Sequence, residues 1–377
     1  MWLLLVALCL APGLENAIPG DEAFYNPERF MNISQKILLH GYPSEEHEVM
    51  TEDGYFLSLS RIPYGRGDAG LSGLRTPVLI VHGFCLEGGD WVDNFPDSSL
   101  AFILADAGYD VWIGNNRGNS WSRWHRNLSI GSEEFWDFSF HEMAMYDLPA
   151  MVDFILAQTE QEKLFYVGHA QGSSLGFIAF SSLPQLAEKI KLFFALAPVY
   201  TFHHVQGPVL KLAFLPDLVL KVQEVFVGGY CQNPGTFGNS RPPCIVTVER
   251  KLFFCIAAIR QNEVFYYTSV KNLLHWGQTA KTGEFKQFDY GLRNLEKYKR
   301  LRPPFYQIEA MRVPVAVWSG GQDWVTPPVE TQRLLSRLTN IIHHEHFPDW
   351  NHFDHHWGLN APQRLYRQMV TLMEENL

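Results

Sequence analysis

Short hydrophobic runs alternate with longer segments of helical periodicity along most of the chain. Continuous apolar runs bounded by glycine, proline or polar residues are typical of buried strands in parallel sheets. Segments built around such runs, together with the more polar segment 341–347, predict strands at residues 76–84, 109–118, 163–167, 191–198, 313–323 and 341–347. Helical patterns stand at 98–108, 140–159 (where Pro149 predicts a kink), 328–339 and from Ala361 onward. The alternation predicts an α/β fold with a mostly parallel central sheet flanked by helices.

This alternation is interrupted between residues 199 and 302. The stretch holds amphipathic pieces and a segment dense in glycine and proline, GGYCQNPGTFGNSRPPC, which is typical of a loop. The regular pattern resumes afterwards. We therefore expect one core formed by residues 18–198 and 303–377, with residues 199–302 inserted as a helical cap or lid.

The first residues, MWLLLVALCLAPG, form an apolar run that is too short to cross a bilayer. Small and then polar residues follow, so we interpret residues 1–17 as a signal peptide with an approximate boundary. No later segment supplies the roughly 18 uninterrupted apolar residues of a membrane span. We expect a secreted protein without a transmembrane segment. The sequons at Asn32 and Asn127 agree with export and are candidate glycosylation sites.

Composition narrows the class of function. Hydrophobic residues make up 46% of the 377-residue chain and aromatic residues 14%, which excludes a disordered protein. The formal net charge is −10. We expect the lysine and arginine residues to be dispersed along the chain and not clustered. A nucleic-acid-binding protein shows a basic patch, so nucleic acid is excluded as a partner.

The pentapeptide GHAQG at residues 168–172 follows one hydrophobic run and precedes a helical pattern. Its frame is that of G-x-S-x-G, the sharp strand-to-helix turn that presents a nucleophile in one large class of hydrolases. The outer positions must be small because side chains there would collide. Ala170 occupies the central position and offers no nucleophile. An ordinary glycine-bounded turn is the alternative to this interpretation.

In this class the acid and the histidine follow the nucleophile in chain order. Asp323 comes just after a buried run, where a carboxylate would orient an imidazole. His352 comes after the last run, where it would accept a proton from a serine and return it to the leaving alcohol. The backbone N–H groups of Gln171 and of Phe84, in the turn after the first run, would form the oxyanion hole. Taken singly, Asp323 is explained equally well as a helix N-cap, and His352 is explained equally well as a surface histidine.

Metal binding is a further hypothesis, because histidines crowd one region together with Asp349 and Asp354. The histidines are His343, His344, His346, His352, His355 and His356. Only alternate residues of a strand share a face, and no H-E-x-x-H spacing occurs. We therefore expect a solvated histidine-rich surface and no metal site.

A series of motifs carries a family resemblance. HGF, NNRGNSWSR, FSFHEMAMYDLPA, YVGHAQG, FIAFS, ALAPV, SGGQD and NHFDHHW occur in this order. Together they closely resemble the acid lipase family of gastric and lysosomal lipases. The resemblance implies an α/β-hydrolase core with a helical cap over an apolar site, triacylglycerol or cholesteryl ester substrates, and export as a glycoprotein. It implies no metal or organic cofactor. It places Ala170, Asp323 and His352 at the three catalytic positions, and Phe84 and Gln171 at the oxyanion hole.

The resemblance also implies a disulfide in the cap. By order, Cys231 and Cys244 match the family's bridge, and Cys255 matches a free thiol nearby. The spacing differs from the family's, so a bridge between Cys244 and Cys255 stays open. The cap is shorter and rewritten around its glycine- and proline-rich loop, so lipid selectivity does not carry over through it.

Two functions of different classes follow. The first is a secreted lipid-binding protein that keeps an apolar pocket and lacks turnover because Ala170 replaces the serine. The alternative is an active triacylglycerol or cholesteryl ester lipase, represented by a nucleophile-to-alanine variant. We expect the hydroxyls of Ser173 and Ser174 to point away from the turn and to serve capping or packing. A lipid or other apolar small molecule is the expected partner, and a lipid interface is a further candidate.

Overall fold

The computed structural model describes residues 28, 31–68, 73–206 and 268–377. Residues Met1–Met31 and Asn32–Leu377 form separate units, and the second contains all the elements described below. The predicted signal peptide, most of the predicted cap, and Cys231, Cys244 and Cys255 lie outside the described residues. The segment 268–302 is the part of the predicted cap that lies within them.

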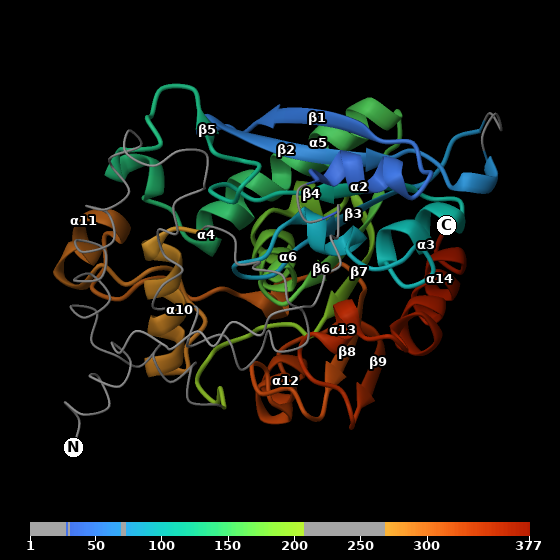
Figure 1. The fold of residues 1–377 in the computed structure, drawn as a ribbon. Helices are drawn as coiled ribbons and strands as arrows, with labels where there is room; N and C mark the ends of the chain where they lie inside the picture. Colours follow the sequence, from blue (N-terminus) through green and yellow to red (C-terminus); the bar gives the residue numbers. More distant parts are fainter. Residues whose placement is uncertain (1–27, 29–30, 69–72, 207–267) are drawn as a thin grey trace, which may run out of the picture. The chain divides into compact units, whose positions relative to one another are not determined.

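A mixed β-sheet forms the centre of the second unit (Figure 1). Its strands are ordered β1-β2-β4-β3-β6-β7-β8-β9, and β5 pairs with β2. Strand β2 is antiparallel to β1, β4 and β5, whereas every pair from β4 across to β9 is parallel. The mostly parallel sheet expected from the sequence is confirmed. The strands are β1 (Glu45–Met50), β2 (Tyr55–Ile62), β3 (Pro77–Val81), β4 (Asp110–Gly114), β5 (Trp124–His125), β6 (Leu164–His169), β7 (Ile190–Leu196), β8 (Val315–Gly320) and β9 (Ile341–Phe347).

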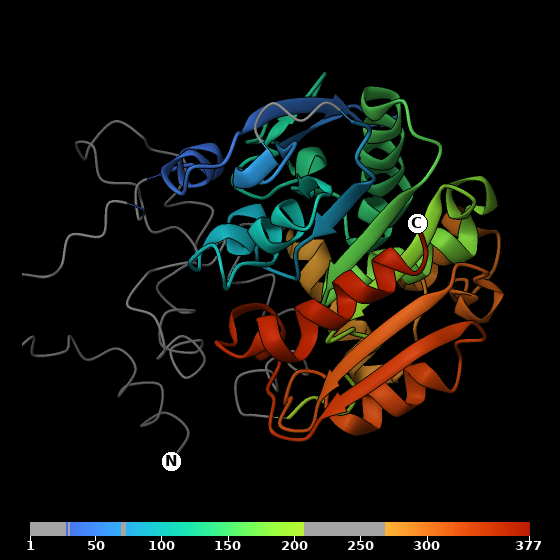
Figure 2. The same cartoon turned by 90° about the vertical axis from the view of Figure 1, so that its right-hand side faces the viewer.

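Helices connect the strands and cover both faces of the sheet. In Figure 2, α14 lies in front of the strands. The α-helices are α2 (Ile33–Leu39), α3 (Leu100–Asp106), α4 (Phe140–Glu142), α5 (Leu148–Thr159), α6 (Gln171–Ser182), α7 (Pro184–Ala187), α10 (Val270–Thr282), α11 (Asn294–Tyr298), α12 (Pro328–Leu335), α13 (Asp354–Trp357) and α14 (Arg367–Glu374). The predicted helices at 98–108 and 328–339 correspond to α3 and α12, both of which are shorter than their hydrophobic patterns.

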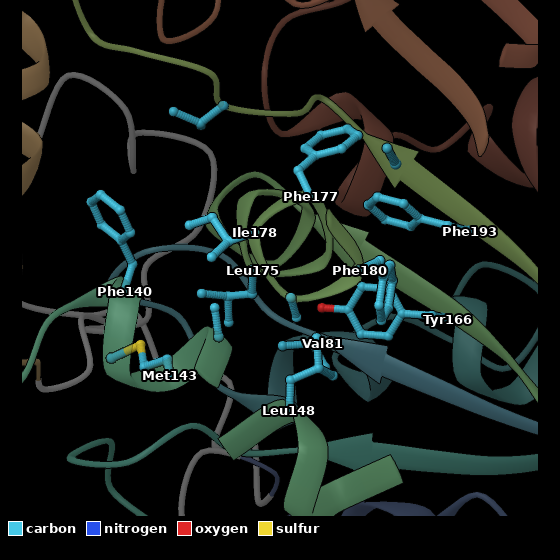
Figure 3. Packing of buried hydrophobic residues seen from close by; sticks show 14 of the residues in the cluster. Val81, Phe140, Met143, Leu148, Tyr166, Leu175, Phe177, Ile178, Phe180 and Phe193 are labelled. Carbon is cyan, nitrogen blue, oxygen red and sulfur yellow. The ribbon is translucent and has the colours of Figure 1, made fainter. Parts of the chain in front are cut away.

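Successive side chains of a strand point to opposite faces of the sheet, so the core consists of one cluster on each face. On β3, Leu79 and Val81 belong to the cluster under α5 and α6. Val78 and Ile80 belong to the other cluster, together with residues of α3 and α14. Figure 3 shows side chains of the first cluster around α6, which contributes Leu175, Phe177, Ile178 and Phe180. Because both faces are covered, β3 is hydrophobic and buried at every position, and this is the pattern that the sequence showed.

The helical pattern at 140–159 is not one continuous α-helix. It consists of α4, a π-helical turn at Met143–Asp147, and α5. Pro149 is the second residue of α5 and has no N–H to donate, and the residue before it, Leu148, donates its N–H to the Met143 carbonyl in the π-turn. The irregularity that we expected at Pro149 is therefore the π-turn just before it.

Helix α10 begins with a side-chain cap and ends at a glycine. The Ser269 hydroxyl accepts a hydrogen bond from the Asn272 N–H at 2.9 Å. Gly283 closes the helix at a φ of +66°, which a residue without a Cβ adopts at little cost. One side of α10 packs into the core, where Trp276 is fully buried beside Phe140 and Phe202. The carboxyl part of the predicted cap is thus joined firmly to the core.

The closest backbone approach that bears on the site is between Gly172 on α6 and Val81 on β3. A Cβ at Gly172 would lie 2.4 Å from the carbonyl oxygen of Val81 and 2.8 Å from that of His82. We predict that Gly172→Ala lowers the free energy of unfolding by about 3 kcal/mol, because neither carbonyl can move without disturbing the sheet. Urea unfolding measures this.

Gly67→Ala is the matched control, because a Cβ there would meet nothing within 4 Å. We expect the control to stay within about 0.5 kcal/mol of the parent chain. Equal losses in the two variants would contradict the steric explanation.

Candidate active site

The turn after β6 has the geometry that the GHAQG pattern predicts. Ala170 lies between the last residue of β6 and the first residue of α6, with φ +50° and ψ −114°. Its N–H donates to the carbonyl of Leu196 at 2.9 Å, and its own carbonyl accepts from the Ser173 N–H at 3.0 Å. A positive φ at a residue with a Cβ costs about 1–3 kcal/mol, and such strain clusters at functional sites.

The glycines at both ends of the pentapeptide are needed for space. A Cβ on Gly168 would lie 2.5 Å from the carbonyl carbon of Gly172, and one on Gly172 would strike β3. Across the turn, an ideal Cβ on Gly83 would approach the Ala170 methyl group to 3.1 Å. The first turn of α6 is therefore pressed against the end of β3, and this brings Ala170 next to the segment that contains Phe84.

Asp323 and His352 form a buried hydrogen-bonded pair. The Nδ1–H of His352 donates to Asp323 Oδ2 at 2.8 Å, and both side chains are almost fully buried. Because Nδ1 carries the proton in this arrangement, Nε2 of the neutral ring keeps its lone pair. An imidazole held in this tautomer is what a general base requires.

Three further hydrogen bonds hold the Asp323 carboxylate. The N–H groups of Val325 and Thr326 donate to Oδ1 at 2.9 and 2.7 Å, and the Thr326 hydroxyl donates to Oδ2 at 2.7 Å. Burial alone would raise the pKa of Asp323, but His352 and the Thr326 donors outweigh it and hold that pKa below its ordinary value. The carboxylate is therefore kept in the charged form.

The candidate site residues lie at one edge of the sheet. Phe84 follows β3, Ala170 follows β6, Asp323 follows β8 and His352 follows β9, so all come after the carboxyl ends of parallel strands. The Nε2–H of His169 donates to the backbone carbonyl of His352 at 3.2 Å. This contact joins the residue before Ala170 to the loop that holds the histidine.

The two predicted oxyanion donors lie on either side of the turn. Gln171 is the first residue of α6, where N–H groups lack intrahelical partners. Within the described residues, neither its N–H nor that of Phe84 donates a hydrogen bond. The Gln171 side chain is fixed instead: its Oε1 accepts from Trp276 Nε1 at 2.7 Å and from Asn272 Nδ2 at 3.0 Å.

Two serines follow Ala170, and neither hydroxyl is available as a nucleophile. The Ser173 hydroxyl donates to the Gly168 carbonyl, and the Ser174 hydroxyl donates to the Val199 carbonyl, both at 2.6 Å. Both residues are fully buried. The hydroxyls satisfy backbone carbonyls, in agreement with the packing role expected from the sequence.

The histidine-rich region divides into two parts, and the expected solvated surface is only partly right. His344 and His346 are exposed on β9, where they contact the hydroxyl of Ser319. His355 and His356 are buried instead, and His356 packs on Trp91 with a ring distance of 4.2 Å. Both lie on the short helix α13, where the His355 ring also packs against Trp350. Among the residues that the structure describes, no group of three acidic, histidine or cysteine side chains could hold a metal ion.

Sequence reasoning missed several residues that position the site. Thr326 could have been found, because an acid followed three residues later by threonine is the spacing of a side-chain-capped turn. His169 was part of the pentapeptide, yet nothing in the sequence shows its bond to the His352 carbonyl. The roles of Asn272 and Trp276 depend on a contact between helices more than a hundred residues apart, which one sequence does not reveal.

The remaining predicted sites fall partly within the described residues. Asn127 is exposed in the loop after β5. Asn32 is half-buried, and its Oδ1 caps α2 by accepting from the Gln35 N–H at 2.7 Å. Within the part of the chain that the structure describes, no helix is long and apolar enough to span a membrane.

The fold and the sequence comparisons agree on the class. Residues 33–95 match the family described as partial alpha/beta-hydrolase lipase region, and residues 76–215 match the alpha/beta hydrolase fold. A thermophilic esterase structure from Thermogutta terrifontis aligns with a TM-score of 0.51 at 16% identity, covering 88% of this chain and 98% of the esterase. A hypothetical protein from Pseudomonas aeruginosa aligns with a TM-score of 0.56 at 12% identity, covering 92% and 96%. The protein is an α/β-hydrolase by fold.

Curated relatives define the family within that class. Gastric triacylglycerol lipase from Homo sapiens is 43% identical over 396 residues, covering all of both chains. Lysosomal acid lipase/cholesteryl ester hydrolase from Macaca fascicularis is 43% identical over 390 residues, covering 99% of this chain and 98% of the relative. Lipase member M from Homo sapiens is 42% identical, covering all of this chain and 93% of the relative. The chain belongs to the acid lipase family.

A buried histidine beside the site gives a pH-dependent prediction. The Nδ1–H of His82 donates to the Gly83 carbonyl, so Nε2 accepts from the Asn116 N–H. Burial lowers the pKa of His82 to about 4, against about 6.5 in an unfolded chain. The contribution of neutral His82 to the free energy of unfolding is therefore complete above pH 6.5 and is lost as the pH falls toward 4.

We predict that His82→Gln, which keeps a donor and an acceptor, makes the free energy of unfolding less sensitive to acidification. Between pH 7 and pH 5 the parent chain loses on the order of 2 kcal/mol more than the variant, because its unfolded state binds a proton that the native His82 does not. Buried Asp90 has a raised pKa and acts in the opposite direction, so the difference between the two proteins is the readout. Parallel pH curves from urea unfolding would contradict the assignment.

Proposed function

We propose that the protein is a secreted, lipase-like lipid-binding protein that does not turn over esters. The observation that supports this is Ala170: the strained turn presents a methyl group at the place where a serine hydroxyl would attack an ester carbonyl. Acid lipase relatives named for triacylglycerol and cholesteryl ester support an apolar ligand. The signal peptide, the glycans at Asn32 and Asn127, and the cap disulfide between Cys231 and Cys244 belong to the same proposal.

The hydrogen bond between Asp323 and His352 and the position of Ala170 support the following proposed roles. Asp323 would orient His352, and His352 would be the general base, with Phe84 and Gln171 as oxyanion donors. Without a hydroxyl at residue 170 the base has no proton to remove, and no acyl intermediate forms. Loss of the nucleophile from a serine triad costs about 10⁶ in kcat, and the oxyanion hole and binding retain only about 10³–10⁴ over the reaction in water.

An active triacylglycerol or cholesteryl ester lipase, represented by a nucleophile-to-alanine variant, is the second candidate. The intact pair of Asp323 and His352 favours it, because these side chains keep the hydrogen bonds that a working triad uses. The two candidates differ in whether Ala170 is the natural residue or stands in for a serine nucleophile.

We predict that Ala170→Ser produces ester hydrolysis in a protein that otherwise shows none. A serine oxygen placed on the strained turn supplies the missing nucleophile, and kcat on a short-chain ester rises by about 10³-fold or more. Release of p-nitrophenol from p-nitrophenyl butyrate measures this, and Ala170→Ser/His352→Gln is the matched control that stays inactive. Robust hydrolysis by the parent chain would overturn the proposal. Activity in the variant that survives loss of His352 would overturn the assigned base.

We also predict that the parent chain binds an apolar ligand without consuming it. Fluorescence of cis-parinaric acid should rise when protein is added, because an apolar pocket removes the probe from water. Cholesteryl oleate should then displace the probe and be recovered unhydrolysed. Leu359→Ser is the control, since this leucine is 85% exposed and does not belong to the core. Absence of probe binding by the parent chain would contradict the lipid-binding part of the proposal.

A further inference from the structure

An exposed leucine-rich and basic segment lies between α10 and β8. It comprises residues 291–302, GLRNLEKYKRLR, and is called the basic-leucine segment below. Leu292, Leu295 and Leu301 are 94%, 56% and 74% exposed. Single exposed leucines are common on protein surfaces and need no explanation, but three within one short segment are unusual.

The same segment carries a strong positive charge. Its basic side chains are all exposed, Glu296 is its only acid, and the basic residues are Arg293, Lys297, Lys299, Arg300 and Arg302. Among the described residues, none of the five forms an ion pair with a carboxylate. The chain as a whole has a net charge of −10, so the dispersion of lysine and arginine expected from the sequence fails here. This positive patch is a local feature of an acidic protein.

The segment is held in place by hydrogen bonds from its few buried groups. Asn294 Nδ2 donates to Asp289 Oδ1 at 2.7 Å and to the Leu301 carbonyl at 2.9 Å. The Tyr298 hydroxyl donates to the Phe288 carbonyl at 2.8 Å. The leucines and basic groups therefore project from a fixed frame, and docking would not have to order the backbone first.

The frame is joined to α10 and through it to the candidate site. Gln278 on α10 donates to the Asp289 carbonyl at 2.9 Å and accepts from the Asp289 N–H at 2.7 Å. Two other α10 residues, Asn272 and Trp276, hold the side chain of Gln171, the residue after Ala170. Figure 1 shows α11 beside α10, and α14 at the other side of the drawing.

We propose that the basic-leucine segment docks the protein on an anionic lipid surface. Exposed leucines enter the boundary between headgroups and acyl chains, and the basic side chains attract anionic headgroups. A polysaccharide or nucleic acid would match the charge alone and would leave the leucines in water. The proposal does not depend on the function proposed above, since docking needs neither Ala170 nor a filled pocket.

Flotation with vesicles tests the proposal. The full chain is mixed with phosphatidylcholine vesicles, either pure or containing phosphatidylserine at about 30 mol%, an anionic content chosen to give a strongly negative surface. We expect binding to the anionic vesicles only, and at least tenfold weaker binding when the salt concentration rises from about 0.1 to about 0.5 M, because salt screens surface charge.

Two sets of substitutions separate the apolar and electrostatic parts. Leu292→Ser/Leu295→Ser/Leu301→Ser and Lys297→Gln/Arg300→Gln/Arg302→Gln should each lower the partition coefficient by about tenfold or more. The matched controls, Leu359→Ser and Arg367→Gln, change an exposed leucine and an exposed arginine elsewhere and should bind as the parent does. Thermal melts check that every variant is folded.

Three results would overturn the proposal. One is equal flotation of the parent and both sets of variants. Another is equal binding to neutral and anionic vesicles. The third is binding to heparin that needs the basic residues but not the leucines, without flotation, which would indicate a polysaccharide partner. Binding of cis-parinaric acid should stay unchanged in all variants, so failure of docking and failure of lipid binding in the pocket are distinguishable.

Discussion

The contact between the first turn of α6 and the end of β3 is the constraint on which the site depends. Gly172 leaves no room for a side chain next to the carbonyl of Val81, and Gly168 leaves none next to Gly172. Between strand and helix in this space, Ala170 adopts a positive φ of 50°. That conformation presents the residue at the carboxyl edge of the sheet, beside the loop of Phe84. The strained turn and the dense packing around it therefore depend on each other. Both are present although Ala170, the central residue of the turn, has no reactive side-chain atom.

The polar groups around this turn form a connected hydrogen-bonded set. Asp323 receives donors from His352, Val325 and Thr326, and His352 is oriented with its Nδ1 proton toward the acid. Such a buried carboxylate is stable because each oxygen has partners. The pair can persist as a structural unit without catalysis, since removal of Asp323 would leave the buried Nδ1–H of His352 without its acceptor. The pair is therefore compatible with a lipid-binding protein, although its survival favours the active lipase.

The sequence predicted most of the core and less of the site's surroundings. Strands β3, β6, β7 and β8 are almost wholly buried and mostly hydrophobic because both faces are covered, so their pattern could be recognised without tertiary information. The π-turn before α5 and the burial of His355 depend on packing between distant segments, and local pattern does not encode them. The hydrogen bonds of Gln171 to Trp276 and Asn272 are of the same kind. The order of the motifs along the chain was enough to predict Asp323 and His352 as candidate site residues. This works because the topology brings the carboxyl ends of the parallel strands to one edge of the sheet.

Treatment of the purified protein with a fluorophosphonate, followed by peptide mass spectrometry, tests the central claim most directly. The reagent forms a stable adduct with an activated serine, whichever serine that is. The account predicts no adduct on any serine of the parent chain, including Ser173 and Ser174, whose hydroxyls already donate to backbone carbonyls. A stoichiometric adduct on either of these serines would show that the site has a nucleophile after all and would contradict the account.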